Sequence, residues 1–293
     1  MSSIEKTVYL IGSAAGSAAG DSGCSDGPLV LQQSPYLAAL SAKGLKLQWQ
    51  AMLKPTPESS VLETVRHHCH RLGTEVADLV RQQRFFMVLG GDHSCAIGTW
   101  SGVHSAIHSE GPLGLIWIDA HMDSHTPETS PSGNVHGMPL ACLLGHGNSS
   151  LVNMLGDSPK LKPENVCLIG VRSFEAGEAE LLQRLNVRVF FMEEVQQRGL
   201  AAVFAEALTR VNQETIAYGV TLDIDSIDPE EAPGTGVSEA NGLHIQELCQ
   251  VLRGIRGDKR FLGAEIVEFD PHHDQSHLTE KCVADLIVAM VGQ

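Results

Sequence analysis

Short apolar runs alternate with longer amphipathic stretches along most of the chain. Runs rich in β-branched residues predict strands at 6–11, 85–89, 113–118, 165–170, 187–191, 216–222 and 261–267, with an eighth near 45–50. Apolar positions at helical spacing predict helices at 58–83, 94–108, 136–145, 175–186, 199–213, 244–255 and 279–291. Because such alternation is typical of parallel strands joined by crossover helices, we expect an α/β fold whose mainly parallel sheet carries helices on both faces.

No internal repeat, low-complexity tract or linker interrupts this alternation. The segment SAAGSAAG (13–20) is small and Gly-rich, but it follows the first predicted strand, so we interpret it as a βα loop. With 293 residues, the chain is long enough for one large α/β domain or two smaller ones. Without a linker, a single domain over 1–293 is the expected organisation.

Polar clusters follow three of the predicted strands, at the places where open parallel sheets bind ligands. They are GGDHS (90–94), IWIDAHMDSH (116–125) and LDIDSIDP (222–229). In the second and third clusters an ionisable residue recurs at every second position, so these side chains point to the same side of an extended chain. Asp228 precedes a proline and is more typical of a turn than of a ligand.

The three clusters supply two imidazoles and four carboxylates, from His93, Asp119, His121, Asp123, Asp223 and Asp225. Close carboxylates repel one another and raise each other's pKa unless cations lie between them. Four carboxylates carry −4 and two divalent cations carry +4, so a pair of ions that share bridging carboxylates fits the count. Oxygen ligands with some imidazole and no thiolate favour Mn²⁺, with Co²⁺, Ni²⁺ or Fe²⁺ as alternatives.

A pair of divalent ions lowers the pKa of a bridging water and presents hydroxide near neutral pH. Hydroxide attacks electrophilic carbon or phosphorus, so the residues predict metal-dependent hydrolysis. No cluster of Arg and Lys near the motifs is available to clamp a phosphoryl group, which disfavours a phosphatase.

Composition limits the partners and the compartment. The net charge of −15 argues against nucleic acid or an anionic membrane as a partner. No apolar run approaches the roughly 18–20 residues of a membrane span, and the N-terminal apolar stretch is too short for a typical signal peptide. Seven cysteines without framework spacing suggest reduced thiols, so we expect a cytoplasmic protein.

The motifs GGDHS, DAHMD and DIDSIDP, in this order, resemble those of the ureohydrolase superfamily, which includes arginases, agmatinases and formimidoylglutamases. The resemblance covers nearly the whole chain, from DSGCSDGP (21–28) to VEFDP (267–271). It implies a three-layer α/β/α sandwich with a parallel sheet of about eight strands, usually assembled as trimers or hexamers. It also implies two Mn²⁺ ions and hydrolysis of a guanidinium or formimino carbon in a small-molecule substrate.

The resemblance assigns roles to individual residues. It implies that the ligands are His93 and Asp123 for one ion, His121 and Asp225 for the other, and Asp119 and Asp223 as bridges. Glu268 matches the glutamate that pairs with the substrate guanidinium, and His136, in SGNVHG, matches a proton-shuttling histidine. Asp123 would also accept a proton from the attacking hydroxide. Glu265 competes weakly with Glu268, because three residues earlier in a strand it should face the opposite side.

Within the superfamily the chain is most similar to arginases, which implies hydrolysis of L-arginine to L-ornithine and urea. Ser132 and Asn134 match the segment that holds the α-carboxylate of the substrate, and Glu175 matches the position that binds its α-amino group. Three positions depart from the pattern, since His125 replaces an Asn, Val237 a Thr and Glu175 an Asp. His125 is either a donor to the α-carboxylate or a residue of a surface loop.

Two other functions are compatible with the same motifs. Hydrolysis of another guanidine, such as agmatine or guanidinobutyrate, would agree with the altered positions at the amino-acid end of the substrate. A non-catalytic metal-binding protein would need only the six ligands. The presence of Glu268 and His136, which match catalytic positions, disfavours this alternative.

Overall fold

One eight-stranded sheet runs through the computed structural model, which describes residues 7–157 and 159–292. Its strands are β1 (Val8–Ser13), β2 (Leu47–Leu53), β3 (Phe86–Gly90), β4 (Leu113–Ile118), β5 (Val166–Val171), β6 (Arg188–Phe191), β7 (Ala217–Asp223) and β8 (Phe261–Val267). Their spatial order is β2-β1-β3-β8-β7-β4-β5-β6, and all neighbours pair in parallel. The predicted parallel α/β fold is therefore confirmed. Lys6, the first residue of the strand predicted at 6–11, lies outside the described residues.

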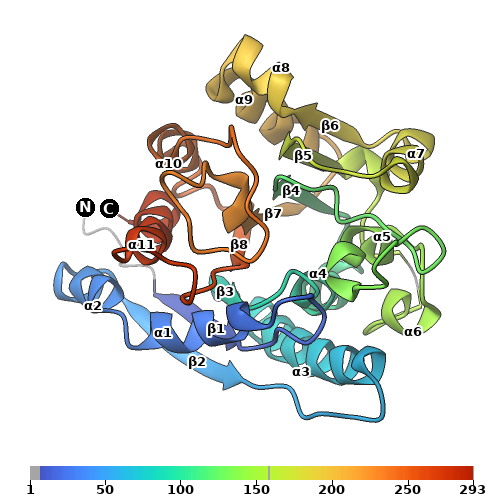
Figure 1. Cartoon of the computed structure of the whole chain (residues 1–293), viewed down its shortest axis with the longest axis horizontal. Coiled ribbons are helices and arrows are strands. Elements are labelled where there is room, and N and C mark those ends of the chain that lie inside the picture. Colours follow the sequence, from blue (N-terminus) through green and yellow to red (C-terminus); the bar gives the residue numbers. More distant parts are fainter. Residues whose placement is uncertain (1–6, 158, 293) are drawn as a thin grey trace.

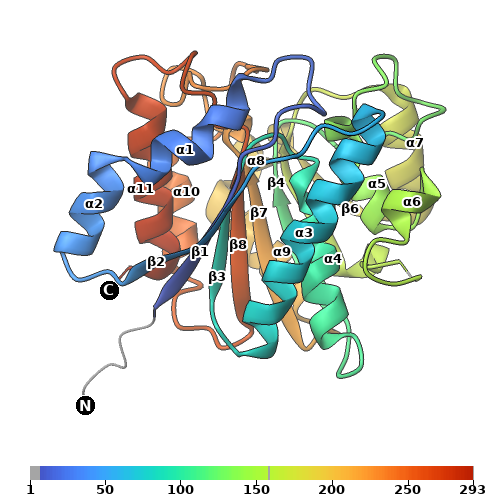
Figure 2. The same cartoon turned by 90° about the horizontal axis from the view of Figure 1, so that it is seen from below.

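Helices cover both faces of this sheet and complete three layers (Figure 1, Figure 2). One face packs against α1 (Gly27–Gln32), α2 (Pro35–Ala42), α8 (Met192–Arg198), α9 (Leu200–Val211), α10 (Ile245–Arg253) and α11 (Leu278–Val291). The helices on the other side are α3 (Val61–Arg81), α4 (Cys95–Ile107), α5 (Pro139–Leu143), α6 (Ser149–Val152) and α7 (Ala176–Leu185). Successive residues of a strand point to opposite layers, as Ile116 and Trp117 do, so the central strands are apolar throughout.

Some elements differ from the sequence prediction for identifiable reasons. The helix predicted at 136–145 is interrupted at Pro139, because proline has no backbone N–H to donate to the preceding turn; a 3-10 turn, η2 (Val135–Gly137), precedes α5. The weak strand near 45–50 is β2, an edge strand in which Gln48 and Gln50 are exposed. The short helices α1, α2 and α8 were not predicted, because each has too few turns to display a helical period.

The order of the strands brings the polar clusters together. Strands β3, β8, β7 and β4 are consecutive neighbours in the middle of the sheet. Since all four are parallel, their carboxyl ends lie at the same edge, and the loops that follow them meet there.

The turn after β3 is built on a close approach to the end of β1. The backbone N–H groups of Gly91 and Asp92 donate to the carbonyl oxygens of Ser13 and Ala15, at 2.7 and 2.8 Å. A Cβ atom on Gly91 would lie 1.8 Å from the Ala15 carbonyl oxygen, so only glycine fits. Asp92 also accepts a hydrogen bond from the Ser94 backbone N–H, and Ser94, the N-cap residue of α4, makes no capping bond with its own side chain.

The state of the cysteines and the apolar character of the helices bear on the expected compartment. All seven cysteines are buried free thiols. Within 7–157 and 159–292, no helix has both the length and the apolar character needed to cross a bilayer.

Candidate metal centre

The six predicted ligands converge at the carboxyl ends of β3, β4 and β7. His93 Nδ1 lies 3.2 Å from Asp119 Oδ2 and 2.9 Å from Asp123 Oδ2. The same nitrogen is 3.0 Å from Asp223 Oδ2. On the other side of Asp119, His121 Nδ1 lies 3.6 Å from Asp119 Oδ1. The two oxygens of Asp119 therefore face different imidazoles.

These side chains form two overlapping groups, each with three atoms close enough to hold one ion. They are His93, Asp119 and Asp223 in the first group, and Asp119, His121 and Asp225 in the second. Asp119 belongs to both groups, which is the position of a bridging ligand. Asp223 lies on the His93 side, and its Oδ1 accepts the backbone N–H of Asp225 at 2.9 Å.

Burial makes this cluster unfavourable unless cations occupy it. His93 Nδ1 and Asp123 Oδ2 are buried and lie 2.9 Å apart, but neither has a partner with hydrogen-bond geometry among the described residues. Burial, followed by repulsion from Asp119, raises the pKa of Asp123 to about 6. Burial and the neighbouring carboxylates raise the pKa of Asp223 well above its ordinary value. Because divalent cations would satisfy the unpaired atoms and neutralise the carboxylates, the donor set fits a pair of metal ions.

Two acidic residues of the site have left-handed backbone conformations. The φ angle is 48° at Asp123 and 62° at Glu268, and such conformations cost non-glycine residues about 1–3 kcal/mol. Glu268 is held by its backbone N–H, which donates to the Gly91 carbonyl at 2.8 Å, and by its Oε1, which accepts the His93 N–H at 2.8 Å. The surrounding contacts therefore maintain a strained backbone at the site.

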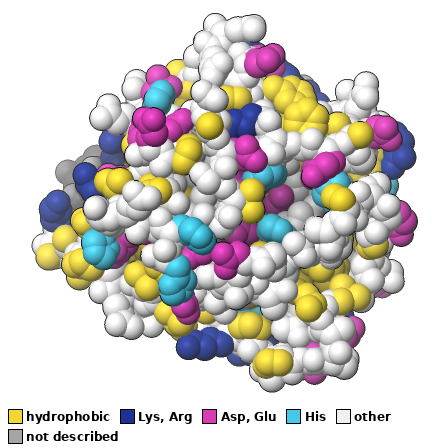
Figure 3. Space-filling model, viewed as in Figure 1, with side chains coloured by type: hydrophobic (Ala, Val, Ile, Leu, Met, Phe, Trp, Pro, Cys, Tyr) yellow, Lys and Arg dark blue, Asp and Glu magenta, His cyan; other side chains and the backbone are white. Residues whose placement is uncertain are grey.

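A cavity of about 210 Å³ opens beside the cluster. The sequence-predicted residues that line it, in addition to metal ligands, are His125, Ser132, Asn134, His136, Glu175, Val237 and Glu268. Figure 3 shows histidine and acidic side chains gathered around a hollow in the middle of this face. Among the described lining residues there is no Lys or Arg, so the cavity suits a cationic group.

His125 and Glu175 contact each other in the cavity wall. His125 Nε2 lies 3.0 Å from Glu175 Oε2 and 3.4 Å from Glu178 Oε2. His125 is buried, so it is not a residue of a solvent-exposed loop. Glu178 forms a capping box with Glu175 at the start of α7, and burial raises the pKa of Glu178 to about 8. His125 therefore presents its Nε2 to two carboxylates in the cavity wall.

Arg172 ties the loops on one side of the site together. Its guanidinium donates to the carbonyl oxygens of Asp225 and Glu239, both at 2.7 Å, and to that of Ala240 at 3.0 Å. Because Asp225 is a predicted ligand and the segment 232–240 contributes to the cavity wall, Arg172 fixes these two parts relative to each other.

Several residues of the site were not predicted from the sequence, among them Thr235, Glu178 and Trp117. Thr235 lines the cavity with a buried hydroxyl that has no partner among the described residues, and no sequence signal marks it. Glu178 could have been found from the E-x-x-E spacing of a capping box. Trp117 donates from its indole nitrogen to Asp119 Oδ2 at 2.8 Å and stacks on the His93 ring. Trp117 lies two residues before Asp119, so the two-residue period of DAHMD, continued toward the N-terminus, would have indicated it.

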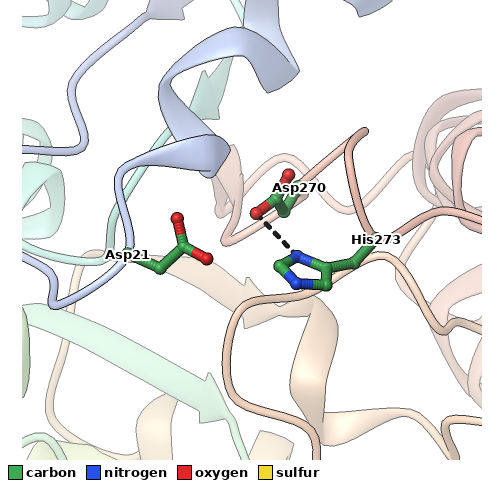
Figure 4. A group of neighbouring side chains, drawn as sticks. All are labelled: Asp21, Asp270 and His273. Carbon is green, nitrogen blue, oxygen red and sulfur yellow. Dashed lines mark hydrogen bonds and ion pairs between the residues drawn. The ribbon is translucent and has the colours of Figure 1, made fainter.

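A third group of possible ligands, Asp21, Asp270 and His273, lies outside the cavity lining (Figure 4). His273 Nδ1 is 2.9 Å from Asp270 Oδ2. Gly23 packs against the same carboxylate, because a Cβ atom there would lie 2.2 Å from Asp270 Oδ2. Asp270 is buried, whereas Asp21 and His273 are exposed. We interpret this group as a contact between two loops.

His136 and Glu268 form an ion pair at the cavity, with His136 Nδ1 3.3 Å from Glu268 Oε1. Burial alone would lower the pKa of His136, but the hydrogen bond and the charge of Glu268 outweigh it and raise the pKa to about 9. The folded pKa is thus above the ordinary value of about 6.5. The pair therefore stabilises the metal-free protein fully below about pH 6.5, and this stability is lost as the pH rises toward 9.

We accordingly expect His136→Asn to destabilise the metal-free protein at pH 6, by on the order of 1–3 kcal/mol, and to have little effect at pH 10. Urea unfolding in the presence of a chelator, repeated across this range, measures the difference. His70→Asn, at an exposed position of α3, is the control and should show the same small effect at every pH. A His136→Asn effect that grows with pH would contradict the ion pair.

Comparisons with known proteins agree on one family. The model of the arginase family matches residues 6–292. The arginase of Brevibacillus brevis is 34% identical, and the alignment covers 99% of each chain. The arginase of Bacillus caldovelox is 40% identical over 79% of this chain and 77% of its own length. The crystal structure of arginase from Bacillus subtilis superimposes with a TM-score of 0.91 at 34% identity, covering 98% of this chain and 99% of that one.

Proposed function

The chain belongs to the arginase family, and from this premise we propose that it hydrolyses the guanidinium group of L-arginine to give L-ornithine and urea. The observation that carries the proposal is the convergence of two ligand groups beside a cavity that contains Glu268 and His136. A cationic substrate entering a cavity lined by carboxylates suits this arrangement.

The two groups that share Asp119 would hold two divalent ions, with Asp123 as an additional ligand on the His93 side. The mixture of carboxylate and imidazole ligands favours Mn²⁺, with Co²⁺, Ni²⁺ and Fe²⁺ as alternatives. When bound, such ions lower the pKa of a coordinated water and so make a nucleophile available near neutral pH.

The chain's own residues orient the substrate and move the protons. The Glu268 carboxylate would accept N–H bonds from the guanidinium and place its carbon beside the ligand cluster. The Asp123 carboxylate would accept a proton from the attacking oxygen. His136, which forms an ion pair with Glu268, would give a proton to the leaving nitrogen. That nitrogen departs as the ornithine amine, and the carbon keeps two amino groups and the new oxygen as urea.

The other end of the cavity would hold the amino-acid part of the substrate. Ser132, Asn134 and His125 offer donors to the α-carboxylate, and Glu175 offers an acceptor to the α-ammonium group. His125 Nε2 and Glu175 Oε2 contact each other at 3.0 Å. When substrate binds, its α-carboxylate would accept from His125 and its α-ammonium group would donate to Glu175, so two contacts with the substrate would replace the contact between the two side chains.

Steady-state urea release from Mn²⁺-loaded protein tests the substrate. We expect arginine to be preferred over agmatine, which lacks the α-carboxylate, and over guanidinobutyrate, which lacks the α-amino group. His125→Ala should lower kcat/KM for arginine by about 10- to 100-fold, because it removes a charge-assisted hydrogen bond. The same change should affect agmatine less.

Equal rates of wild-type protein on arginine and agmatine would contradict the arginine proposal. They would favour the second candidate, hydrolysis of another guanidine substrate. One observation favours that candidate: Val237 is 45% exposed at the cavity, and an apolar side chain there offers no hydrogen bond to an amino-acid head group.

Further proposals concern the protein as a whole. We propose a single domain over 1–293 and a homo-oligomer, trimeric or hexameric, acting in the cytoplasm on a small molecule without nucleic acid or membrane partners. The family resemblance supports the oligomer, and the net charge of −15 and the seven buried free cysteines support the other parts. Sedimentation equilibrium of the metal-loaded protein measures the oligomer.

A further inference from the structure

A row of polar and aromatic side chains crosses the sheet one step below the ligands. Trp117 of β4 pairs with Thr221 of β7, and Thr221 pairs with Glu265 of β8. Asp119 follows Trp117 by two residues, and Asp223 follows Thr221 by two. Because side chains two apart in a strand share a face, this row lies directly beneath the ligand cluster.

Glu265 is fully buried in this row and accepts hydrogen bonds from three side chains. Thr221 Oγ1 donates to Glu265 Oε2 at 2.9 Å, and Cys95 Sγ donates to Glu265 Oε1 at 3.4 Å. Thr99 Oγ1 donates to the same Oε1. Glu265 does not line the cavity, so these contacts leave it no role in binding substrate.

The direction of these bonds determines which nitrogen of His93 carries hydrogen. A threonine hydroxyl has one hydrogen, and that of Thr221 is directed to Glu265, so its lone pairs face His93 Nε2 at 3.1 Å. His93 Nε2 must then be the donor, so in the neutral imidazole that binds a metal ion Nδ1 is the unprotonated nitrogen. This nitrogen is the one that faces the carboxylate oxygens of the cluster.

We propose that Thr221 and Glu265 are positioning residues, which fix the tautomer and orientation of His93 for one of the two metal ions. The proposal rests on the metal-dependent function proposed above and adds two residues to it. Imidazole ligands of metals commonly donate their second N–H to a fixed acceptor, which sets the ring orientation and the metal affinity. Stacking of His93 on Trp117, with ring centroids 4.4 Å apart, restrains the plane of the same ring.

Calorimetric titration of metal-stripped protein with Mn²⁺ tests the proposal without depending on activity. We expect wild-type protein to bind two ions, and Thr221→Val to weaken one site by about 10- to 100-fold while the other is retained. Thr221→Ser keeps the hydroxyl and should restore the lost affinity. Glu265→Gln should weaken the same site, because it removes the charged acceptor that orients Thr221.

The matched control is Thr215→Val, which removes another buried hydroxyl, bonded to the Val211 carbonyl away from the cluster. It should leave both sites unchanged. If Thr221→Val does not fold, as judged by the thermal unfolding of the metal-free protein, the comparison of Thr221→Cys with Thr221→Ser replaces it, since a thiol is a poor acceptor.

The outcomes separate the two proposals. Wild-type protein that binds no Mn²⁺ would overturn the proposed function. Wild-type protein that binds two ions, together with Thr221→Val or Thr221→Cys that binds both equally well, would overturn the role of Thr221 alone. An unchanged isotherm for Glu265→Gln would remove Glu265 from the proposal.

Discussion

Replacing Asp119 by Asn is expected to abolish the binding of both metal ions and to reduce arginine hydrolysis by at least about 1000-fold, because metal stabilisation of charge in the transition state contributes several kcal/mol. The reason lies in the geometry, since Asp119 is the one predicted ligand that belongs to both groups. Metal content after dialysis and the rate of urea release measure the two effects.

Asp225→Asn is the matched control, because Asp225 belongs only to the second group. We expect it to retain about one ion per chain, whereas Asp119→Asn retains none. Wild-type protein stripped with a chelator should lose activity in the same way and regain it with Mn²⁺. Two ions bound to Asp119→Asn would contradict a shared ligand.

Replacing Glu268 by Gln is expected to lower kcat/KM for arginine by about 100- to 1000-fold, because loss of one partner of a buried charge pair costs roughly 2–5 kcal/mol. The amide keeps the shape of the side chain but removes the charge that would meet the guanidinium. Steady-state kinetics with arginine measures the loss, and metal content should stay at two ions, since Glu268 belongs to neither ligand group.

Glu230→Gln serves as the control for this change, because Glu230 is an exposed residue of the loop that follows β7. It should leave kcat/KM within a factor of about two, as expected of a surface substitution. A Glu268→Gln protein that keeps wild-type kinetics would show that guanidinium binding depends on other groups. Loss of the metal ions would show instead that Glu268 supports the cluster.

The fold was predictable where the chain is buried on both faces. Strands such as β4, with six buried residues in succession, form continuous apolar runs that stand out in the sequence. The edge strand β2 carries alternating glutamines, and α1 and α2 are short, so their signals were weak. The order of the strands was not predictable, because the residues of 261–267 alone do not indicate that β8 lies between β3 and β7.

The site was predictable in its residue types but not in its internal arrangement. The two-residue period of Asp119, His121 and Asp123 indicated the candidate ligands, since it directs several side chains to one place. The period alone does not reveal that His125 turns into the cavity wall to meet Glu175, which depends on the packing of α7. Thr235 lies in a loop without regular spacing, and only the folded structure shows its buried hydroxyl.

The position of β8 also determines when the ligand group that contains His93 can be completed during synthesis. Ribosomes produce β3, β4 and β7 before β8, yet β8 lies between β3 and β7 and joins the two halves of the sheet. Until 261–267 has been translated and inserted, His93 at the end of β3 has no fixed distance to Asp223 at the end of β7. A growing polypeptide therefore cannot complete the group of His93, Asp119 and Asp223 before this late strand is inserted, whereas Asp119, His121 and Asp225 follow β4 and β7, which pair directly.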